Sequence, residues 1–298
     1  MSKNTKSAFI AIVGRPNAGK SSIMNRLLGQ KVAIVSDKPQ TTRTRIMGVL
    51  TEEDTQYVFI DTPGLHKPRT ALGQKMVKAV GDGMSDVDGC ILVCDASQGI
   101  GIPERELMKE FKKRKIPAIL ALNKTDLIKN KEELLALILT FAGEFDWSGV
   151  VPVSAKTGDG FGGLKEEMEK LAVEGVHMFD DDTLTDQPER VIAAELVREK
   201  MLRLLDREIP HGTAVQVERF VLREDDGILD IDCTVFCEKD SHKGIIIGHG
   251  GAMLKKIGSL ARHDMEEFFC CKVNLKCWVK VKENWRNSEV MIRNFGLD

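Results

Sequence analysis

The sequence predicts an α/β protein of two domains. The larger domain has a mostly parallel sheet covered by helices on both faces, and a small α+β domain follows it. Three observations support this prediction. A G-x-x-x-x-G-K-S phosphate loop, Gly14–Ser21, follows an apolar run. Apolar runs and amphipathic stretches alternate over residues 1–175, which is typical of parallel sheets. After an acidic break, a second pattern of helices and strands begins.

The alternating pattern of the first domain predicts a sheet whose strands are linked by helices. The runs near residues 90–94 and 118–122 are apolar throughout, as expected for central parallel strands that are buried on both faces. The predicted strands are 8–14, 45–51, 56–61, 88–95, 117–123 and 149–154, and the predicted helices are 19–28, 72–85, 103–115, 131–145 and 161–174.

Residues 176–188 interrupt this pattern, and we interpret them as a linker between a domain at 1–175 and a domain at 189–298. The stretch Asp180–Pro188 is acidic and ends in proline. Asp225–Gly227 has the composition of a hairpin turn. The second domain is predicted to run in the order helix 189–207, strands 213–223 and 228–238, helices 242–247 and 252–268, and strand 272–282.

The composition of the 298-residue chain narrows its class. The net charge is −2, so a basic surface for nucleic acid would have to be local. No run approaches the roughly 18 apolar residues of a membrane-spanning helix. The seven cysteines include no C-x-x-C pair, and we find no secretion signal, so we expect reduced thiols in the cytoplasm. For Cys270, Cys271 and Cys277 we prefer core packing to zinc binding.

The phosphate loop sits between a predicted strand and a predicted helix, which is the context that this motif requires. Its glycines let the backbone approach phosphate oxygens, and the N-terminus of the next helix favours an anion. Lys20 is then placed to reach the β- and γ-phosphates, and Ser21 to hold Mg²⁺.

A second motif, Asp61-Thr62-Pro63-Gly64, ends a predicted strand. A carboxylate there can hold Mg²⁺ through a water, and the Gly64 N–H can contact the γ-phosphate. A threonine between the two motifs should complete the metal site. We prefer Thr42, with Thr41 as the alternative.

The motif Asn123-Lys124-Thr125-Asp126 stands at the end of the predicted strand 117–123 and is typical of guanine recognition. The Asp126 carboxylate can accept hydrogen bonds from the N1–H and 2-amino groups of guanine, a donor pair that adenine lacks. Lys124 is expected to cover the base, and Ser154-Ala155-Lys156 to support the guanine oxygen. All these motifs fall at strand ends, where ligands of such sheets gather.

The position that carries a catalytic glutamine in many GTPases is not glutamine here. Leu65 and His66 follow Gly64. We therefore expect slow hydrolysis that is limited by water positioning. We favour a His66 that does no chemistry over one that replaces the glutamine, and Asn17 is a candidate for holding K⁺ beside the phosphates.

The second domain carries a G-x-x-G turn, Gly248–Gly251, between two predicted helices. Within its αββααβ order, this turn indicates a type II KH fold, which binds a nucleic-acid backbone at the turn. Residues 239–286 contain ten basic and five acidic residues, a net charge of +5. This local excess suits a phosphate backbone. Of the two tryptophans nearby that could stack on bases, we expect Trp278 to pack in the core instead.

Together, these motifs resemble those of the Era family of bacterial GTPases. The resemblance covers nearly the whole chain and rests on Gly14–Ser21, Gln40–Arg43, Asp61–Pro68, Asn123–Asp126, Ser154–Lys156 and Gly248–Gly251. It implies a P-loop GTPase domain and a KH domain that bind GTP or GDP, Mg²⁺ and small-subunit ribosomal RNA near its 3′ end. It also implies a role in small-subunit maturation and peripheral association with the inner membrane, and we expect a monomer.

The motifs assign roles to individual positions. The expected catalytic residues are Lys20, Thr42 and Gly64, and the expected metal ligands are Ser21, Thr42 and Asp61. The expected nucleotide-binding residues are Gly14, Arg15, Pro16, Asn17, Ala18, Gly19, Lys20, Ser21, Ser22, Asp61, Thr62, Pro63, Gly64, Leu65, Asn123, Lys124, Asp126, Ser154, Ala155 and Lys156. The expected RNA-binding residues are Lys243, Gly248, His249, Gly250, Gly251, Lys255, Lys256 and Arg262.

Two hypotheses of function follow. In the first, GTP and Mg²⁺ order residues 36–45 and 61–72, and this ordering changes how the KH domain docks and frees its RNA groove. Hydrolysis then releases the ordered residues and the complex. In the second, the protein is a non-catalytic RNA-binding scaffold that bound guanine nucleotide merely stabilises. The missing glutamine keeps the second hypothesis open.

Overall fold

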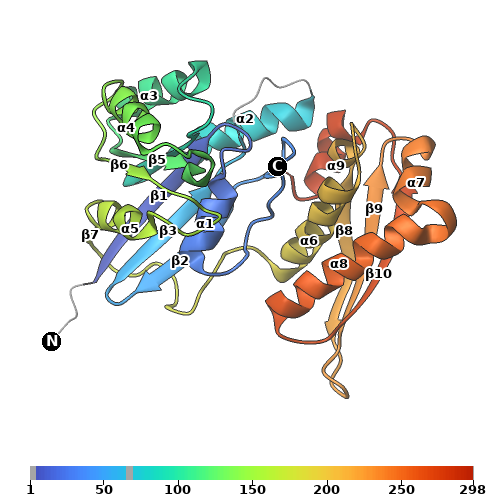
Figure 1. Ribbon diagram of the computed structural model, residues 1–298. Coiled ribbons are helices and arrows are strands. Elements are labelled where there is room, and N and C mark those ends of the chain that lie inside the picture. The colour runs from blue at the N-terminus through green and yellow to red at the C-terminus, as the bar shows by residue number, and fades with distance from the viewer. Residues whose placement is uncertain (1–4, 65–69, 298) are drawn as a thin grey trace. The chain divides into compact units, whose positions relative to one another are not determined.

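The computed structural model describes residues 5–64 and 70–297, which form two compact units. Figure 1 gives the elements of both units in chain order. Of the described residues, the first unit contains 5–33, 42–64 and 76–186, and the second contains 34–41, 70–75 and 187–297. The segment 34–41 therefore groups with the C-terminal residues, although the sequence on both sides of it belongs to the first unit.

The first unit is built on a seven-stranded sheet within the described residues, in the order β2-β3-β1-β4-β5-β6, with β7 paired to β1. The central pairs from β3 to β6 are parallel, whereas β2 and β7 run antiparallel to their partners, so the predicted mostly parallel sheet is confirmed. The strands are β1 (Lys6–Gly14), β2 (Ile46–Glu52), β3 (Thr55–Asp61), β4 (Gly89–Asp95), β5 (Ala118–Asn123), β6 (Gly149–Pro152) and β7 (Val173–Glu174).

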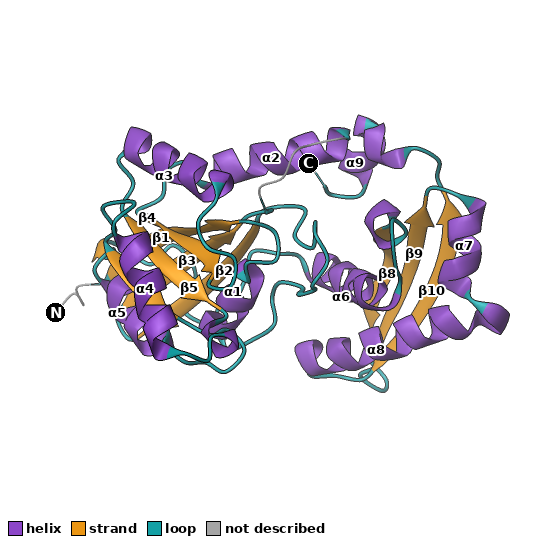
Figure 2. Ribbon diagram, turned by 45° about the horizontal axis from the view of Figure 1, so that its top comes forward, coloured by secondary structure: helices purple, strands orange, loops and turns teal. Residues whose placement is uncertain are grey.

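Helices cover both faces of this sheet because alternate residues of its strands point to opposite sides. In β4, Ile91 and Val93 belong to a core with α1 and α5, whereas Cys90, Leu92 and Cys94 belong to a core with α3 and α4. Figure 2 shows the sheet between its helices. The helices are α1 (Lys20–Leu28), α2 (Ala71–Gly83), α3 (Ile102–Arg114), α4 (Lys131–Ala142) and α5 (Phe161–Glu169).

The second unit has the predicted αββααβ order and a three-stranded sheet in the order β10-β9-β8. β9 is antiparallel to β8 and parallel to β10. One core unites the sheet with apolar residues of α6, α7 and α8, among them Leu196, Ile246 and Ile257. The elements are α6 (Glu189–Leu204), β8 (Ala214–Leu222), β9 (Leu229–Cys237), α7 (Asp240–Ile247), α8 (Ala252–Phe269), β10 (Val273–Val281) and α9 (Glu289–Asn294).

Several helices end earlier than predicted: helix 131–145 ends at Ala142 and helix 189–207 at Leu204. The predicted helix 161–174 ends at Glu169, because residues 173–174 pair with β1 as strand β7. Helix α9 was not predicted. Its N-cap is Ser288, whose hydroxyl accepts the Met291 N–H at 3.4 Å.

The expectation for the tryptophans was wrong. Trp278 is 45% exposed, whereas Trp285 is completely buried and donates its indole N–H to the Gly212 carbonyl at 2.9 Å. The alternation of β10 explains the first result, because the neighbouring Cys277 and Val279 belong to the core side and Trp278 must point the other way.

The acidic stretch that we interpreted as a linker is hydrogen-bonded to the first unit. The Gln56 side chain accepts the N–H groups of Met178 and Phe179 at 2.8 and 3.0 Å, and Val49 donates its N–H to the Leu184 carbonyl at 2.8 Å. Backbone pairing therefore extends well beyond the last helix of the first unit. Among the described residues, no helix has the length and apolarity needed to cross a membrane.

Candidate functional site

The sequence motifs of the first unit meet at one edge of its sheet. β3, β1, β4 and β5 are neighbours, and their register sets Ile12 beside Asp61 and Asp95 beside Asn123. Because parallel strands end at the same edge, the residues that follow them converge there. The phosphate loop leaves β1, the Asp61 motif leaves β3, and the Asn123 motif leaves β5.

The phosphate loop is enclosed by the ends of the neighbouring strands. Gly14 has φ +147°, and a Cβ there would lie 2.4 Å from the Val93 carbonyl oxygen. Gly19 has φ +102°, and its Cβ would lie 2.1 Å from Nδ2 of Asn123. Only glycine fits at these two places, which explains in packing terms why the motif needs it.

Lys20 is buried inside this loop. Its Nζ donates to the carbonyl oxygens of Gly14 and Arg15 at 3.3 and 2.9 Å. Burial lowers the pKa of Lys20, and the Asp61 carboxylate opposes that shift. The ammonium group is thus held by backbone carbonyl groups inside the curve of the phosphate loop.

Three oxygen-bearing side chains gather beside Lys20. Ser21 Oγ donates to Asp61 Oδ2 at 2.6 Å and lies 2.9 Å from Thr42 Oγ1, which lies 3.3 Å from the same carboxylate oxygen. Burial raises the pKa of Asp61, and Lys20 opposes that shift. Thr41 is placed differently, because its hydroxyl lies 2.8 Å from Ser36 Oγ.

This oxygen cluster fits a small, hard cation. The second carboxylate oxygen of Asp61, Oδ1, is buried and has no hydrogen-bond partner among the described residues. Such an atom is costly to bury unless something binds it. Hydroxyl and carboxylate oxygens are the ligands that Mg²⁺ takes in nucleotide sites.

The predicted base motif is held by hydrogen bonds to two other loops. The Asn123 amide donates to the Ala18 carbonyl at 2.8 Å and accepts the Ala155 N–H at 3.0 Å. Ser154 Oγ donates to Asp126 at 2.7 Å. Asn123 therefore ties the phosphate loop to the segment after β6, and Ser154 fixes the carboxylate that is predicted to recognise guanine.

Two acidic partners of this site were not predicted. Asp95 accepts from Lys124 Nζ at 2.7 Å, and its pKa lies below the usual value because hydrogen bonds to Lys124 and Ser97 outweigh its desolvation. Glu104 is buried and pairs with Arg15 of the phosphate loop. The only available signal for Asp95 was its position at the end of an apolar strand, in line with the other motifs.

The remaining predicted nucleotide residues lie along the same edge. Gly64 approaches the phosphate loop closely, since its Cβ would be 2.6 Å from the Pro16 nitrogen. The Thr62 hydroxyl donates to the Ile12 carbonyl at 3.0 Å. Of the other positions, Ala18 and Pro63 are buried, Ser22 is half-buried, and Asn17 and Lys156 are exposed. Leu65 and His66 lie outside the described residues.

The G-x-x-G turn of the second unit has the backbone that its glycines allow. Gly248, Gly250 and Gly251 have φ values of +74°, +56° and +82°, in the region that side chains disfavour. A Cβ at Gly250 or Gly251 would meet no atom within 4 Å. At Gly248, by contrast, a Cβ would lie 2.7 Å from the Met253 Cβ. All three positions therefore need glycine for their conformation, Gly248 needs it for packing as well, and the surface is open at Gly250 and Gly251.

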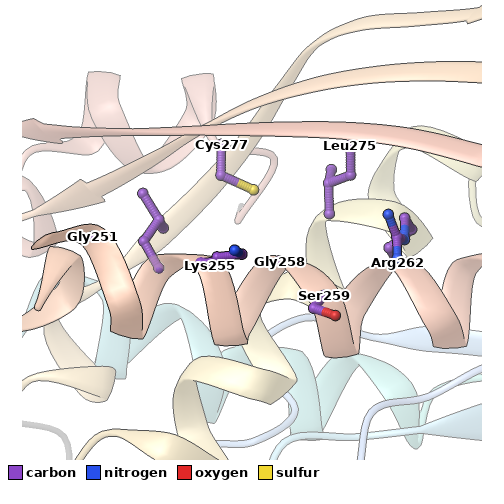
Figure 3. A pocket seen from close by; sticks show the side chains of 8 residues that line it. Gly251, Lys255, Gly258, Ser259, Arg262, Leu275 and Cys277 are labelled. Carbon is purple, nitrogen blue, oxygen red and sulfur yellow. The ribbon is translucent and has the colours of Figure 1, made fainter.

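A groove of about 440 Å³ runs from this turn between α8 and β10 (Figure 3). Of the predicted RNA-binding residues, Gly251, Lys255 and Arg262 line it, whereas Lys243, Gly248, His249, Gly250 and Lys256 do not. The lining residues that we did not predict are Leu254, Gly258, Ser259, Leu275 and Cys277. The spacing along α8 is helical, so one face of the predicted helix 252–268 already pointed to Gly258 and Ser259.

The cysteine expectation is confirmed for the strands and wrong for one residue. Cys90, Cys94, Cys233 and Cys237 are buried, but Cys270 is exposed, and Cys271 and Cys277 are half-buried. Among residues 5–64 and 70–297 there is no group of three or more His, Cys, Asp or Glu side chains that could hold a metal ion.

The fold and site define a class: a P-loop guanine-nucleotide-binding protein with a KH domain. Residues 9–124 match the 50S ribosome-binding GTPase family, and residues 208–286 match the KH domain family. The chain belongs to the Era family of GTPases. It is 48% identical over 293 residues to GTPase Era of Clostridioides difficile (strain 630), with 98% of this chain and 99% of the relative covered. It is 47% identical over 291 residues to GTPase Era of Ruminiclostridium cellulolyticum, with 98% and 97% covered.

Two solved structures of Era have the same fold as this chain. One is a variant of Aquifex aeolicus Era bound to GDP·AlF₄⁻, with a TM-score of 0.94 and 35% identity over 98% of this chain and 99% of that one. The other is Era in complex with MgGDPNP and nucleotides 1506–1542 of 16S ribosomal RNA, with a TM-score of 0.93 and 35% identity over the same shares.

Proposed function

We propose that this protein binds GTP, hydrolyses it slowly to GDP and phosphate, and uses the nucleotide as a switch while it binds small-subunit ribosomal RNA near its 3′ end. Its role is to assist maturation of the small ribosomal subunit. One observation carries the proposal: a guanine-type nucleotide site and an open, basic G-x-x-G groove occur in one chain of the Era family. The solved Era complex with a GTP analogue and 16S RNA supports the choice of RNA.

In this proposal the phosphate loop binds the phosphates through its backbone N–H groups. Lys20 contacts the β- and γ-phosphates, and the Gly64 N–H contacts the γ-phosphate, so the loop after it responds to hydrolysis. The close approach of Gly64 to Pro16 supports this role. The other nucleotide-binding positions that we propose are Gly14–Ser22, Asp61–Pro63, Asn123, Lys124, Asp126 and Ser154–Lys156. Leu65 is also proposed, although it lies outside the described residues.

Guanine specificity is assigned to Asp126. Its carboxylate accepts from the N1–H and the 2-amino group of guanine, while Ser154 holds one of its oxygens at 2.7 Å. Adenine offers no such donor pair and leaves the carboxylate unpaired. Lys124, which Asp95 orients, covers the base plane.

Ser21, Thr42 and Asp61 are the proposed ligands of Mg²⁺, with Asp61 acting through a water. Thr42 is preferred to Thr41 because its hydroxyl lies beside Ser21 and Asp61. When bound, the ion neutralises the negative charge that develops on the phosphates. The protein residues contribute the geometry: Ser21 opens α1, and Asp61 closes β3.

RNA binding is assigned to the second unit. The G-x-x-G turn, Gly248–Gly251, packs against the RNA backbone, and the positive charges of Lys255 and Arg262 lie along the groove. His249, Lys243 and Lys256 flank the groove and are proposed to contact phosphates outside it. Among these residues, Lys255 and Arg262 have the strongest structural support.

The working units of the switch are proposed to be the G domain at 1–175 and the KH domain at 189–298, joined by 176–188. GTP binding orders residues 36–45 and 61–72 and thereby raises the affinity of the KH domain for RNA. Thermodynamic reciprocity then requires RNA to raise the affinity for GTP by the same factor.

Four further features belong to the proposal: peripheral contact with the inner membrane, which rests on the family resemblance, a cytoplasmic location, a monomeric state, and K⁺ held by Asn17 beside the phosphates. Hydrolysis that is equally fast in K⁺ and in a bulky inert cation would count against the last of these.

The rival function is a non-catalytic RNA-binding scaffold stabilised by guanine nucleotide. The observation in its favour is Leu65 at the position after Gly64, where many GTPases have glutamine. Single-turnover GTP hydrolysis with and without RNA separates the two. A switch protein hydrolyses the bound GTP in one turnover, and a scaffold leaves it intact.

The central experiment measures the affinity of the purified protein for an oligonucleotide of the 3′ end of 16S ribosomal RNA, with GDP and with GDPNP. We expect tighter binding with GDPNP, by the roughly 5- to 150-fold typical of coupled sites. Equal affinities would refute the switch. Equal affinity for guanine and adenine nucleotides would refute the nucleotide assignment.

A further inference from the structure

The segment 34–41, which immediately precedes Thr42, is bound to helix α6 within the second unit. α6 buries three consecutive charged residues, Arg198, Glu199 and Lys200, with exposed fractions of 2%, 0% and 4%. Charged side chains are seldom buried unless they are paired. The burial of these three residues therefore depends on the groups with which they are paired.

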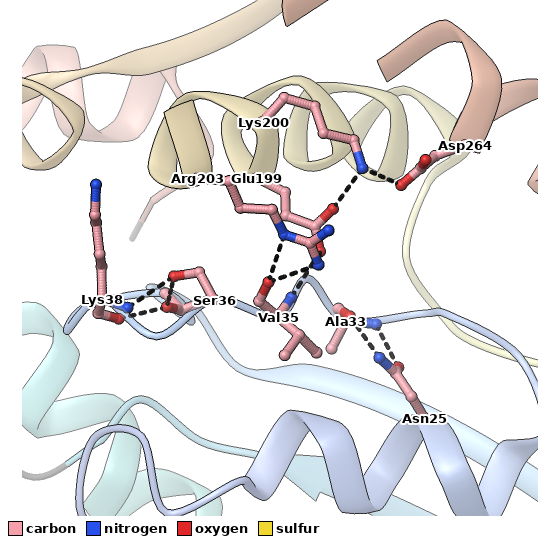
Figure 4. Close-up of polar contacts among 10 residues, drawn as sticks. Asn25, Ala33, Val35, Ser36, Lys38, Glu199, Lys200, Arg203 and Asp264 are labelled. Carbon is pink, nitrogen blue, oxygen red and sulfur yellow. Dashed lines mark hydrogen bonds and ion pairs between the residues drawn. The ribbon is translucent and has the colours of Figure 1, made fainter. Parts of the chain in front are cut away.

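Glu199 is the centre of this arrangement (Figure 4). Its Oε1 accepts the Val35 N–H at 3.0 Å and a hydrogen bond from Arg203 at 3.0 Å. Arg203 also donates to the Val35 carbonyl at 3.1 Å. The peptide groups on both sides of Val35 are thus fixed by one ion pair of α6, between the buried Glu199 and the exposed Arg203.

The other end of the segment is held by the same helix. Arg198 donates to the carbonyl oxygens of Gln40 and Thr41, the residues just before Thr42. Inside the segment, Ser36 Oγ accepts the Lys38 N–H at 3.1 Å and lies 2.8 Å from the Thr41 hydroxyl. These bonds tie the two ends of the segment 34–41 to each other and to α6.

The sequence on either side of the loop is fixed in the first unit. Asn25 of α1 accepts the Ala33 N–H at 2.9 Å and donates to the Ala33 carbonyl at 2.7 Å. On the far side, Thr42 joins the oxygen cluster of Ser21 and Asp61. A displacement of the loop therefore acts directly on Thr42 at one end and on Ala33 at the other, each one peptide bond away.

Glu199 is also linked to the helix that begins at the G-x-x-G turn. Its Oε2 accepts from Lys200 Nζ at 2.9 Å, and the same ammonium group pairs with Asp264 of α8. The Lys255 and Arg262 side chains of the RNA groove lie on α8 as well. Lys200 thus forms ion pairs with two carboxylates: Glu199, which holds residues 34–41, and Asp264, which lies on the RNA-binding helix.

We propose that Glu199 is a positioning residue for the segment 34–41, and that the Glu199–Lys200–Asp264 chain couples occupancy of the RNA groove to the placement of Thr42. A shift of α8 on RNA binding moves Asp264 and takes Lys200 with it. Glu199 then loses part of its interaction with the positive charge of Lys200, and its hydrogen bonds to Val35 and Arg203 change in strength. The inference rests on the proposed function, because it assigns residues to the coupling between nucleotide and RNA.

The test compares Lys200→Met with the unaltered protein. Methionine keeps the length of the side chain and removes the link to Asp264, while Glu199 keeps Arg203 and Val35 as partners. The measured quantity is the ratio of RNA affinities with GDPNP and with GDP, using an oligonucleotide of the 16S 3′ end. Exchange of the backbone amides of residues 34–41, with and without that RNA, gives a second readout that a merely structural role would leave unchanged.

We expect a ratio of at least about 5 for the unaltered protein and a ratio within about twofold of 1 for Lys200→Met. RNA should alter amide exchange at 34–41 in the first protein only. Glu189→Gln, an exposed change on the same helix, is the matched control and should retain the full ratio. Asp264→Asn breaks the same link from its other end and serves if Lys200→Met does not fold.

Failure of this inference differs from failure of the proposed function. If the unaltered protein shows coupling and both Lys200→Met and Asp264→Asn keep it, the residue chain is wrong and the switch stands. If the unaltered protein shows no coupling, the proposed nucleotide switch is wrong, and the proposed Glu199–Lys200–Asp264 link is wrong with it.

Discussion

The protein contains two glycine turns that each open a helix, and they differ in why they need glycine. In the phosphate loop, a Cβ at Gly14 or Gly19 would collide with atoms of neighbouring strands. In the G-x-x-G turn, a Cβ at Gly250 or Gly251 would meet no atom within 4 Å, so only the positive φ angle requires glycine at these two positions. Gly248 is the exception, because its Cβ would lie 2.7 Å from the Met253 Cβ. The first turn is shaped by the protein around it. The second is open at Gly250 and Gly251, where the RNA backbone is proposed to pack.

The contrast predicts that substitutions in the phosphate loop have larger effects than substitutions in the G-x-x-G turn. An enclosed loop has its geometry fixed by several partners, so each change disturbs all of them. An open turn has few protein partners, so a change there should weaken binding and leave the rest of the molecule intact. Four predictions follow, from the largest expected effect to the smallest.

Lys20→Ala should have the largest effect. It removes a buried cation that the loop encloses and that is proposed to contact the phosphates. We expect single-turnover GTP hydrolysis to fall by about 10²–10³-fold, the typical loss for one preorganised donor. Lys109→Ala, an exposed change on α3, is the control and should hydrolyse GTP normally. Unchanged hydrolysis in Lys20→Ala would mean that the loop is not the phosphate site.

Gly19→Ala should come next, because its Cβ would push the Asn123 amide away from Ala18 and Ala155. We expect a loss of stability of about 1–3 kcal/mol from overpacking and a GTP affinity at least about tenfold lower. The measurements are urea unfolding and titration with a fluorescent GTP analogue.

Gly29→Ala is the matched control for Gly19→Ala. It also has a positive φ, +69°, but its Cβ would meet no atom within 4 Å. It should show the backbone cost of about 1–2 kcal/mol without the loss of GTP affinity. If the two variants bound GTP equally well, enclosure would not explain the motif.

The sequence predicted the positions of both turns and of every nucleotide motif, because each motif follows a strand whose apolar pattern is strong. It did not reveal the partners that fix them. Asp95 meets Lys124 only through the register of β4 with β5, and Glu104 meets Arg15 through the packing of α3. Neither contact can be recognised from the local sequence, because the paired residues are 29 and 89 positions apart.

Helix α6 shows the same limit more clearly. Its apolar residues predicted the helix correctly, but a charged run such as Arg198-Glu199-Lys200 is ordinarily a solvent-facing surface. Arg198 and Glu199 are bonded to the segment 34–41, which lies more than 150 residues earlier in the chain, and Lys200 pairs with Asp264 of α8. The prediction that Trp278 packs in the core was wrong for the opposite reason. A large apolar side chain suggested a core position, whereas the alternation of β10 turns it outward.

Gly251→Ala tests the open turn. The substitution strains the backbone at φ +82° but meets no protein atom, so we expect a stability loss of about 1–2 kcal/mol. RNA affinity should fall by about tenfold, because the added methyl group occupies the surface on which the RNA backbone packs. GTP affinity, measured in parallel without RNA, should stay unchanged. A larger loss for GTP than for RNA would reverse the contrast between the two turns.

The smallest expected effect separates two neighbouring lysines of α8. Lys255 lines the groove, whereas Lys256 is exposed one position further around the helix and does not. Lys255→Ala should lower RNA affinity and reduce the slope of log K against log salt by about 1, since one phosphate contact is lost. Lys256→Ala should change the slope by less, because its side chain starts about 100° away around the helix. The two variants have the same charge and helix propensity, so any difference between them reports the face of α8 that meets RNA. Equal slopes for both would mean that RNA responds to the total charge of the helix and that the groove does not define its path.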